Sequence, residues 1–321
     1  MRLIIALPMI LLAAPAAARD PILALPIDCT LGKTCFIQQY TDADPGQGAA
    51  DYTCGPLSYD GHKGTDFALP FISTIDADIA VFAAAPGTVI SVRDGMPDHL
   101  QGTPGAPDVS DRECGNGVVV GHGGGWQTQY CHLKRGSVTV RKGQRVSNAT
   151  TLGHVGLSGQ TQFPHLHLSV RHEGRVVDPF NATGNIACGQ SPETSLWQNT
   201  PPYQPGGIIS VGFSDVIPDY DTVKAGMAGA AFLPPDTPAL VLWAFAYGSQ
   251  PDDGMRLTIT GPGGNILSED LTIDRAQAQF FRAVGRRTTT PWPAGDYRGI
   301  AELTRGGETV DQTDIVVTIR P

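Results

Sequence analysis

The sequence predicts a mainly β protein that is organised as two domains. Its 321 residues are enough for two domains of ordinary size. The 39 glycines and 26 prolines exceed the usual shares of about 7% and 5%, which favours short strands and tight turns over long helices. The formal net charge of −9 argues against a nucleic-acid-binding protein, because such proteins usually present a basic face.

The N-terminus has the pattern of a signal peptide over residues 1–18. Arg2 supplies a positive charge, residues 3–15 are apolar, and the alanines at 16–18 offer a cleavage site. The apolar run is too short to span a bilayer, which needs about 20 residues, so an uncleaved anchor is the less favoured alternative. We therefore expect an exported protein, periplasmic or extracellular, with no transmembrane segment after signal removal.

Six cysteines follow the predicted signal peptide, which suits an oxidising compartment and three disulfides. Strand-like runs at 117–121 and 126–132 flank a Gly-rich turn, so a hairpin there favours the pair Cys114–Cys131. Cys29 and Cys35 can close a small ring, which leaves Cys54 with Cys188. The last two pairs are only one of many possible connectivities.

The mature chain divides into four parts. Residues 19–57 form a Cys-bearing segment, residues 58–190 carry nearly all the histidines, and the Pro-rich residues 191–207 are predicted to be a linker. Residues 208–321 contain short β-rich segments separated by turn signals, which predicts a C-terminal immunoglobulin-like β-sandwich. Those segments are 239–247, 255–260, 265–270, 279–284, 296–303 and 313–319.

Two short histidine motifs predict a metal site in the second part. His165 and His167 flank Leu166 in a strand-like stretch, so both imidazoles face one side while Leu166 and Leu168 face the packed side. In His62-Lys-Gly-Thr-Asp66, Gly64 permits a turn that presents an imidazole beside a carboxylate. Two imidazoles and one carboxylate are a common ligand set for catalytic zinc. The four histidines without ligand spacing are expected to be ordinary surface or core residues: His99, His122, His154 and His172.

These motifs, together with His132 in Tyr-Cys-His-Leu, resemble peptidase family M23, the lysostaphin- and LytM-like cell-wall endopeptidases. The resemblance covers about residues 58–181, in the family order, and includes the connecting segments 143–146, 152–156 and 177–179. It implies an antiparallel β domain of duplicated-hybrid-motif type with a groove across the sheet. It also implies one Zn²⁺ per chain, held by His62, Asp66 and His167, with His132 and His165 as catalytic non-ligand histidines.

The resemblance further implies a zinc metalloendopeptidase whose partners are peptidoglycan stem peptides. Metal-activated water would attack the scissile carbonyl. Cross-links between D-Ala and diaminopimelate are the preferred target, with glycyl bridges or a protein substrate as alternatives. A non-catalytic wall-binding module or hydrolase activator is the competing function, although all five expected residues are present.

Three features depart from the family pattern or stay open. Ser169 stands where many members have an acidic residue, at a position that is not a ligand. The Gly-, Pro- and Asp-rich insertion at 94–112 is either a groove-edge loop or a tolerated surface loop, and the sequence slightly favours the latter. Residues 20–57 either wrap the peptidase domain or shield its groove, and the C-terminal sandwich either recruits a wall or protein partner or acts as a spacer.

Overall fold

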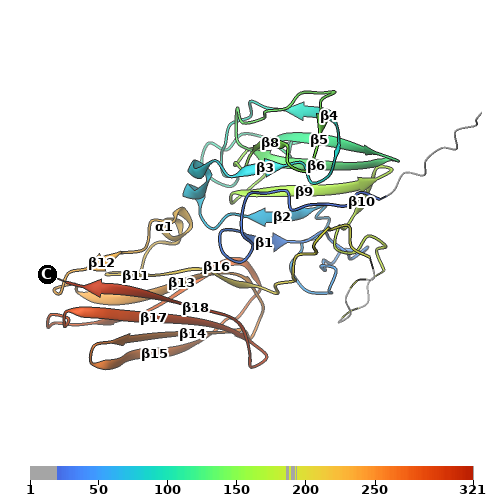
Figure 1. Ribbon diagram of the computed structural model, residues 1–321. Helices are drawn as coiled ribbons and strands as arrows, with labels where there is room; N and C mark the ends of the chain where they lie inside the picture. Colours follow the sequence, from blue (N-terminus) through green and yellow to red (C-terminus); the bar gives the residue numbers. More distant parts are fainter. Residues whose placement is uncertain (1–19, 186–187, 189–191, 193, 321) are drawn as a thin grey trace, which may run out of the picture.

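The regular secondary structure is almost entirely antiparallel β-strand and lies in two packed units, which confirms the predicted mainly β fold class (Figure 1). The computed structural model describes residues 20–185, 188, 192 and 194–320, so the predicted signal peptide lies outside the described residues. Within these ranges, no helix is both long and apolar enough to cross a membrane.

Within the residues that the structure describes, the first unit contains ten strands and one 3-10 helix. They are β1 (Phe36–Gln39), β2 (Thr65–Ala68), η1 (Ile72–Ala77), β3 (Ala80–Phe82), β4 (Gly87–Arg93), β5 (Asn116–Gly123), β6 (Trp126–Leu133), β7 (Arg145–Val146), β8 (Thr151–His154), β9 (His165–His172) and β10 (Arg175–Val177). The main sheet has the order β1-β2-β9-β6-β5-β4-β7, with β10 paired to β9, and β3 pairs with β8 in a small second sheet.

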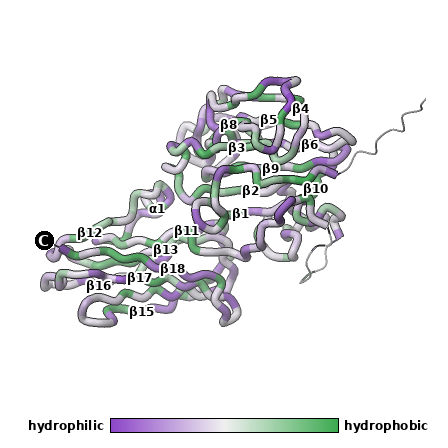
Figure 2. Tube along the Cα trace, in the orientation of Figure 1, coloured by the Kyte–Doolittle hydropathy of each residue, from purple (hydrophilic) through white to green (hydrophobic). Residues whose placement is uncertain are grey.

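Strand β9 shows how the sequence directs the two faces of this sheet. Leu166, Leu168 and Val170 are buried in the core, and Figure 2 shows apolar colouring along β9. His165 and His167 alternate with them and line a groove on the opposite face. The prediction that both histidines share one face is therefore confirmed.

The N-terminal segment wraps the first unit and forms part of its core. Strand β1 pairs antiparallel with β2 at one edge of the main sheet. Tyr40 and Tyr52 pack with Phe180 at ring-centroid distances of 5.1 Å each. Leu196 and Trp197, from the predicted linker, are buried in the same core. The exact domain boundaries stay predictions.

The three disulfides are the three predicted pairs. Cys114–Cys131 joins the start of β5 to β6, Cys29–Cys35 closes a small ring, and Cys54–Cys188 spans 134 residues of sequence. The last of these links the N-terminal segment to the end of the first unit. A cross-link over so long a loop restricts the unfolded chain strongly, and by the chain-entropy model that stabilises the folded state.

The second unit is a β-sandwich with its own apolar core. Its elements are β11 (Gly207–Ser214), α1 (Tyr220–Ala225), β12 (Phe232–Leu233), β13 (Ala239–Ser249), β14 (Gly254–Gly261), β15 (Gly264–Thr272), β16 (Gln277–Arg287), β17 (Gly295–Arg305) and β18 (Glu308–Ile319). One sheet has the order β11-β13-β16 and the other β12-β18-β17-β14-β15. Each of the six predicted β-rich segments lies within one of β13 to β18, whereas β11, α1 and β12 were not predicted.

The immunoglobulin-like character of this sandwich stays a prediction. One observation supports it. Tyr297, near the start of β17, donates a hydrogen bond from its hydroxyl to the Pro293 carbonyl at 2.8 Å. Such a tyrosine corner is a hallmark of immunoglobulin-like sandwiches.

Strand β13 joins the two units because both of its faces are buried. Leu240 and Leu242 point into the sandwich core. On the other face, Phe245 lies 6.5 Å from Phe71 of the first unit, between ring centroids. Tyr247 lies 4.4 Å from Phe36 of β1. A strand that is buried on both faces has a continuous apolar sequence rather than an alternating one, as residues 239–247 do.

The buried carboxyl of Asp178, in the loop after β10, should make the stability of the folded chain depend on pH. Burial, with a smaller contribution from nearby Asp51, raises the pKa of Asp178 to about 7. Its Oδ2 is buried without a hydrogen-bond partner in the described part of the chain. Between the unfolded pKa of 3.8 and the folded pKa, the folded chain retains a proton that the unfolded chain releases. Stability should therefore fall as pH rises through this window.

We expect thermal unfolding to show a larger loss of melting temperature from pH 5 to pH 8 in the wild type than in Asp178→Asn. The difference should be several degrees, because each pKa unit of mismatch corresponds to about 1.4 kcal/mol. Asp76→Asn, at an exposed site, serves as the control and should behave like the wild type. Equal pH dependence in all three proteins would contradict the assignment.

Candidate metal centre

Three potential ligand atoms converge at the junction of β2 and β9. Asp66 of β2 is paired directly with His167 of β9, and His62 lies in the loop that leads into β2. His167 Nδ1 lies 2.7 Å from Asp66 Oδ1, His62 Nε2 lies 3.2 Å from Asp66 Oδ2, and the two imidazole nitrogens lie 3.2 Å apart. All three residues offer ligand atoms within 4.8 Å of one another, so they could hold one metal ion.

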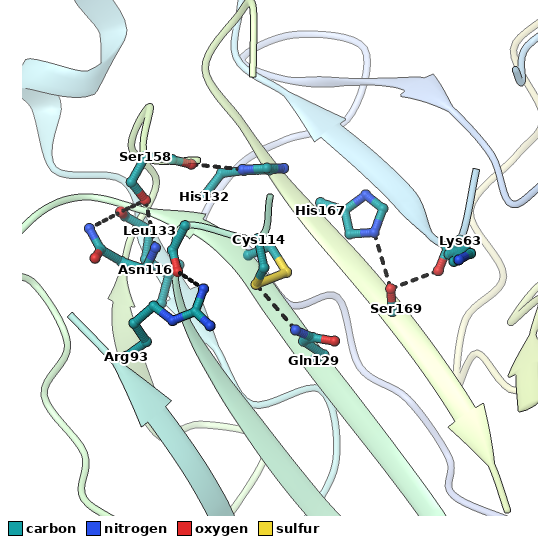
Figure 3. Close-up of a disulfide and its surroundings, with 12 residues drawn as sticks. Lys63, Arg93, Cys114, Asn116, Gln129, His132, Leu133, Ser158, His167 and Ser169 are labelled. Atoms are coloured by element: carbon teal, nitrogen blue, oxygen red, sulfur yellow. Dashed lines mark hydrogen bonds between the residues drawn. A yellow bond between two sulfur atoms is a disulfide. The ribbon is translucent and has the colours of Figure 1, made fainter. Parts of the chain in front are cut away.

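Hydrogen bonds on the far side of each ring orient the two histidines toward this point. His62 Nδ1 lies 2.7 Å from the Tyr40 carbonyl, which can only accept a hydrogen bond, so this nitrogen carries the proton. Ser169 donates its hydroxyl to the Lys63 carbonyl at 2.7 Å and therefore accepts from His167 Nε2 at 3.1 Å (Figure 3). In its neutral form, each ring therefore has the lone pair of its other nitrogen directed at Asp66. Such outer hydrogen bonds are typical of metal-binding histidines.

His132 and His165 present the same pattern beside this cluster. His132 Nδ1 donates to the Ser158 carbonyl at 2.8 Å, as Figure 3 shows, and His165 Nδ1 donates to the Phe163 carbonyl at 2.9 Å. Their ring centroids are 4.6 Å apart, and His165 Nε2 lies 3.6 Å from Asp66 Oδ1. Each ring therefore has an unprotonated Nε2. With His167 they form a second group of potential ligands within 4.8 Å.

The electrostatic environment keeps Asp66 ionised and His132 and His165 neutral. Burial is the strongest single influence on Asp66 and would raise its pKa, but the surrounding imidazoles of His62, His165 and His167 together hold the pKa well below its usual value. Burial lowers the pKa of His132 well below its usual value and also lowers the pKa of His165. Burial also opposes protonation of His62, but Asp66 and the Tyr40 carbonyl leave its pKa raised.

His132 reaches the groove because its backbone leaves the regular strand conformation. Cys131 is paired with His167 and lines the same groove, so strict alternation would point His132 into the opposite face. The φ angle of His132 is 62°, in the left-handed region, and its ring lines the groove beside Cys131. Histidine tolerates this region better than most residues, but the conformation still implies strain, which is common at functional sites.

The five residues lie in a groove of about 980 Å³ that follows alternate residues of β9. Residues of the insertion at 94–112 form part of its wall, among them Gln101, Asp108 and Val109. The insertion is held in place by Asp98, which accepts hydrogen bonds from the backbone of Arg135 and Leu157 at 2.9 Å and 2.7 Å. The interpretation as a mere surface loop, which the sequence slightly favoured, is therefore wrong.

The structure brings together all five residues that the sequence singled out: His62, Asp66, His132, His165 and His167. The other four histidines belong to neither group of potential metal ligands. Sequence reasoning missed the contribution of Ser169, which lies two residues after His167 and therefore faces the same side of β9. That spacing is the signal that could have identified it.

Comparison with known proteins identifies the family of the first unit. Residues 60–179 match the model of peptidase family M23. Over 121 residues the chain is 35% identical to the peptidoglycan DD-endopeptidase ShyA of Vibrio cholerae, a match that covers 38% of this chain and 23% of that protein. It is 41% identical over 64 residues to the cell division protein DipM of Caulobacter vibrioides, covering 20% of this chain and 10% of that protein. The chain therefore carries a domain of peptidase family M23, as its motifs predicted, and matches less than a quarter of the length of these relatives.

A solved structure also aligns with the chain. It is a zinc-containing peptidase from Vibrio cholerae, 25% identical, with a TM-score of 0.28 over 46% of this chain and 39% of that one. The family assignment rests on the sequence matches.

A substitution at Gly64 tests the metal site, because a side chain there would crowd His167. The sequence suggested a turn-forming role, but the structure shows a spatial one, because a Cβ at this position would lie 2.7 Å from His167 Nε2 and 2.5 Å from the Leu168 carbonyl oxygen. We expect Gly64→Ala to weaken metal affinity about tenfold or more, on the scale of one overpacking contact. Metal competition with a chelator measures the affinity. Gly263→Ala, where a Cβ would meet nothing within 4 Å, should leave it unchanged.

Ser169→Ala tests the orientation of His167. Removing the hydroxyl leaves His167 Nε2 without its acceptor, and loss of such a partner typically lowers metal affinity about 10- to 100-fold. The same chelator competition should show this loss while circular dichroism stays unchanged. Ser91→Ala, at an exposed position of β4, is the control. Unaltered affinity in Ser169→Ala would mean that this hydrogen bond does not orient the ligand.

Proposed function

We propose that this chain is an exported zinc metalloendopeptidase that hydrolyses peptide cross-links of bacterial peptidoglycan. The observation that carries the proposal is the convergence of His62, Asp66 and His167, whose ligand atoms lie within 4.8 Å of one another. In the neutral forms that a metal ion binds, the two imidazole lone pairs and the carboxylate would repel one another at this separation. A bound cation removes that repulsion.

The donor set suits zinc in particular. Sites that bind Mg²⁺ or Ca²⁺ use oxygen ligands, whereas two imidazoles and one carboxylate are a common catalytic zinc set. His62 Nε2, Asp66 and His167 Nδ1 would hold the ion. When bound, zinc would supply a Lewis acid that lowers the pKa of water and polarises a peptide carbonyl.

His132 and His165 would handle the proton transfers. Each has a neutral ring, a protonated Nδ1 fixed by a carbonyl, and an Nε2 lone pair in the groove. Such a nitrogen can accept a proton from the attacking water and, once protonated, donate it to the leaving amine. Once Nε2 is protonated, it can also donate a hydrogen bond to a developing oxyanion.

Peptidoglycan is the proposed substrate for two reasons. The M23 domain is 35% identical to a protein named for peptidoglycan endopeptidase activity. Three disulfides indicate an oxidising compartment, as does the predicted signal peptide, and peptidoglycan lies outside the cytoplasm. The preferred bond, between D-Ala and diaminopimelate, belongs to the same proposal.

The C-terminal sandwich would attach to the wall or to a partner protein, or would support the peptidase unit as a spacer. Because Phe245 and Tyr247 pack against Phe71 and Phe36, deleting the sandwich would expose apolar surface on the peptidase unit. Substitutions on the exposed outer faces of β15 and β18 therefore test wall binding better than truncation does.

The proposal predicts one zinc per mature chain and release of cross-linked peptides from purified sacculi. His167→Ala should reduce peptide release by at least about 1,000-fold, because it removes a metal ligand from the reaction centre. Metal analysis by mass spectrometry and chromatography of the sacculus digest measure both properties. His154→Ala, which lies outside the site, should retain wild-type zinc content and activity.

The outcomes separate the competing functions. A folded wild-type chain that contains no zinc and releases no peptide would refute the peptidase and favour a non-catalytic wall-binding module. If the chain binds one equivalent of zinc and cleaves a protein but not sacculi, the metallopeptidase activity is supported and peptidoglycan is refuted as the substrate. The mass of the released fragments identifies the bond that is cut.

A further inference from the structure

A half-buried arginine lies in the groove away from the metal centre. Arg171 of β9 shares a face with His167 and lines the same groove. The two residues are four positions apart on a strand, so their Cα atoms are about 14 Å apart along the groove. An extended peptide bound across the metal centre would reach Arg171 within about four residues.

The guanidinium of Arg171 is held in place on one side and free on the other. Its Nη1 donates to Gln129 Oε1 at 2.6 Å. Among the described residues, neither its Nε nor its Nη2 has a hydrogen-bond partner, and no carboxylate lies within ion-pair distance. The Nε–Nη2 edge is the geometry with which arginine binds a carboxylate through two parallel hydrogen bonds.

Gln129 is itself oriented by the Cys114–Cys131 disulfide. Its Nε2 lies 3.2 Å from Cys114 Sγ, as Figure 3 shows, and this contact turns Oε1 toward Arg171. The disulfide joins β5 and β6 beside His167, because Cys131 is paired with His167. A covalent link thus fixes both the floor of the metal centre and the support of Arg171.

Arg171 also lacks compensation for its burial. Burial lowers the pKa of Arg171, and no acidic group offsets this effect. A half-buried cation without an anionic partner gains from a ligand that supplies the opposite charge.

We propose that Arg171, positioned by Gln129, binds a free carboxylate of the substrate peptide a few residues from the scissile bond. The inference rests on the proposed function and specifies the substrate as a peptide that carries such a carboxylate, on a side chain or at a C-terminus. Arg171 is then a specificity-determining residue for the groove.

The test uses two synthetic cross-linked stem-peptide dimers, one with free carboxylates and one with these groups converted to carboxamides. We expect Arg171→Gln to raise KM for the carboxylate dimer about tenfold or more, on the scale of one charge-assisted hydrogen bond, with kcat within about twofold. The same substitution should leave KM for the carboxamide dimer unchanged. Arg171→Lys should give an intermediate KM, and Arg175→Gln, at an exposed site of β10, should match the wild type.

Calorimetric binding of the corresponding product peptides to the full mature chain provides a readout without turnover. Carboxylate-dependent binding that is lost in Arg171→Gln supports the subsite even if no cleavage occurs, in which case only the proposed function fails. Equal losses on both dimers, or none on either, would overturn the subsite while leaving wild-type cleavage intact. Thermal unfolding verifies that each variant is folded. If Arg171→Gln does not fold, the comparison of the two dimers is made with Arg171→Lys instead.

Discussion

The arrangement of the site depends on one constraint: carbonyl and hydroxyl oxygens fix which nitrogen of each histidine carries the proton. The carbonyls of Tyr40, Ser158 and Phe163 accept from His62, His132 and His165, and Ser169 accepts from His167. In its neutral form, every ring therefore directs its unprotonated nitrogen into the groove. With the Asp66 carboxylate, this places several electron pairs in a small buried space, an arrangement that a divalent cation stabilises.

The acceptors come from widely separated parts of the chain, so the orientation of the histidines depends on the segments that wrap the first unit. Tyr40 follows β1 in the N-terminal segment, whereas Ser158 and Phe163 belong to the connection before β9. The Ser158 region is held by close backbone contact, since a Cβ on Gly115 would lie 2.4 Å from the Ser158 carbonyl carbon.

The second unit contacts the groove region through β1, the strand at one edge of the main sheet. Gln38 of β1 donates to the Ala278 carbonyl at 2.6 Å and accepts from Gln279 at 3.0 Å, and Ala278 lines the groove. In Figure 1, β1 is the strand of the main sheet nearest the sandwich. The sandwich therefore supports the strand next to β2, which carries Asp66.

The sequence by itself determined what depends on local periodicity and residue chemistry. The alternation in β9, the six sandwich strands and the Cys114–Cys131 pair followed from short patterns, whereas the other two disulfides were one of many open connectivities. His62, Asp66, His165 and His167 followed from two short motifs, and the complete set of five with its roles followed from a family resemblance. Only the tertiary structure decided that His132 turns into the groove through a left-handed backbone and that the insertion at 94–112 forms a groove wall. It likewise decided that Ser169 orients His167 and that β13 is buried on both faces. The apolar run of β13 and the spacing of Ser169 are visible locally, but which segments they contact, and where the insertion lies, depend on residues far apart in the chain.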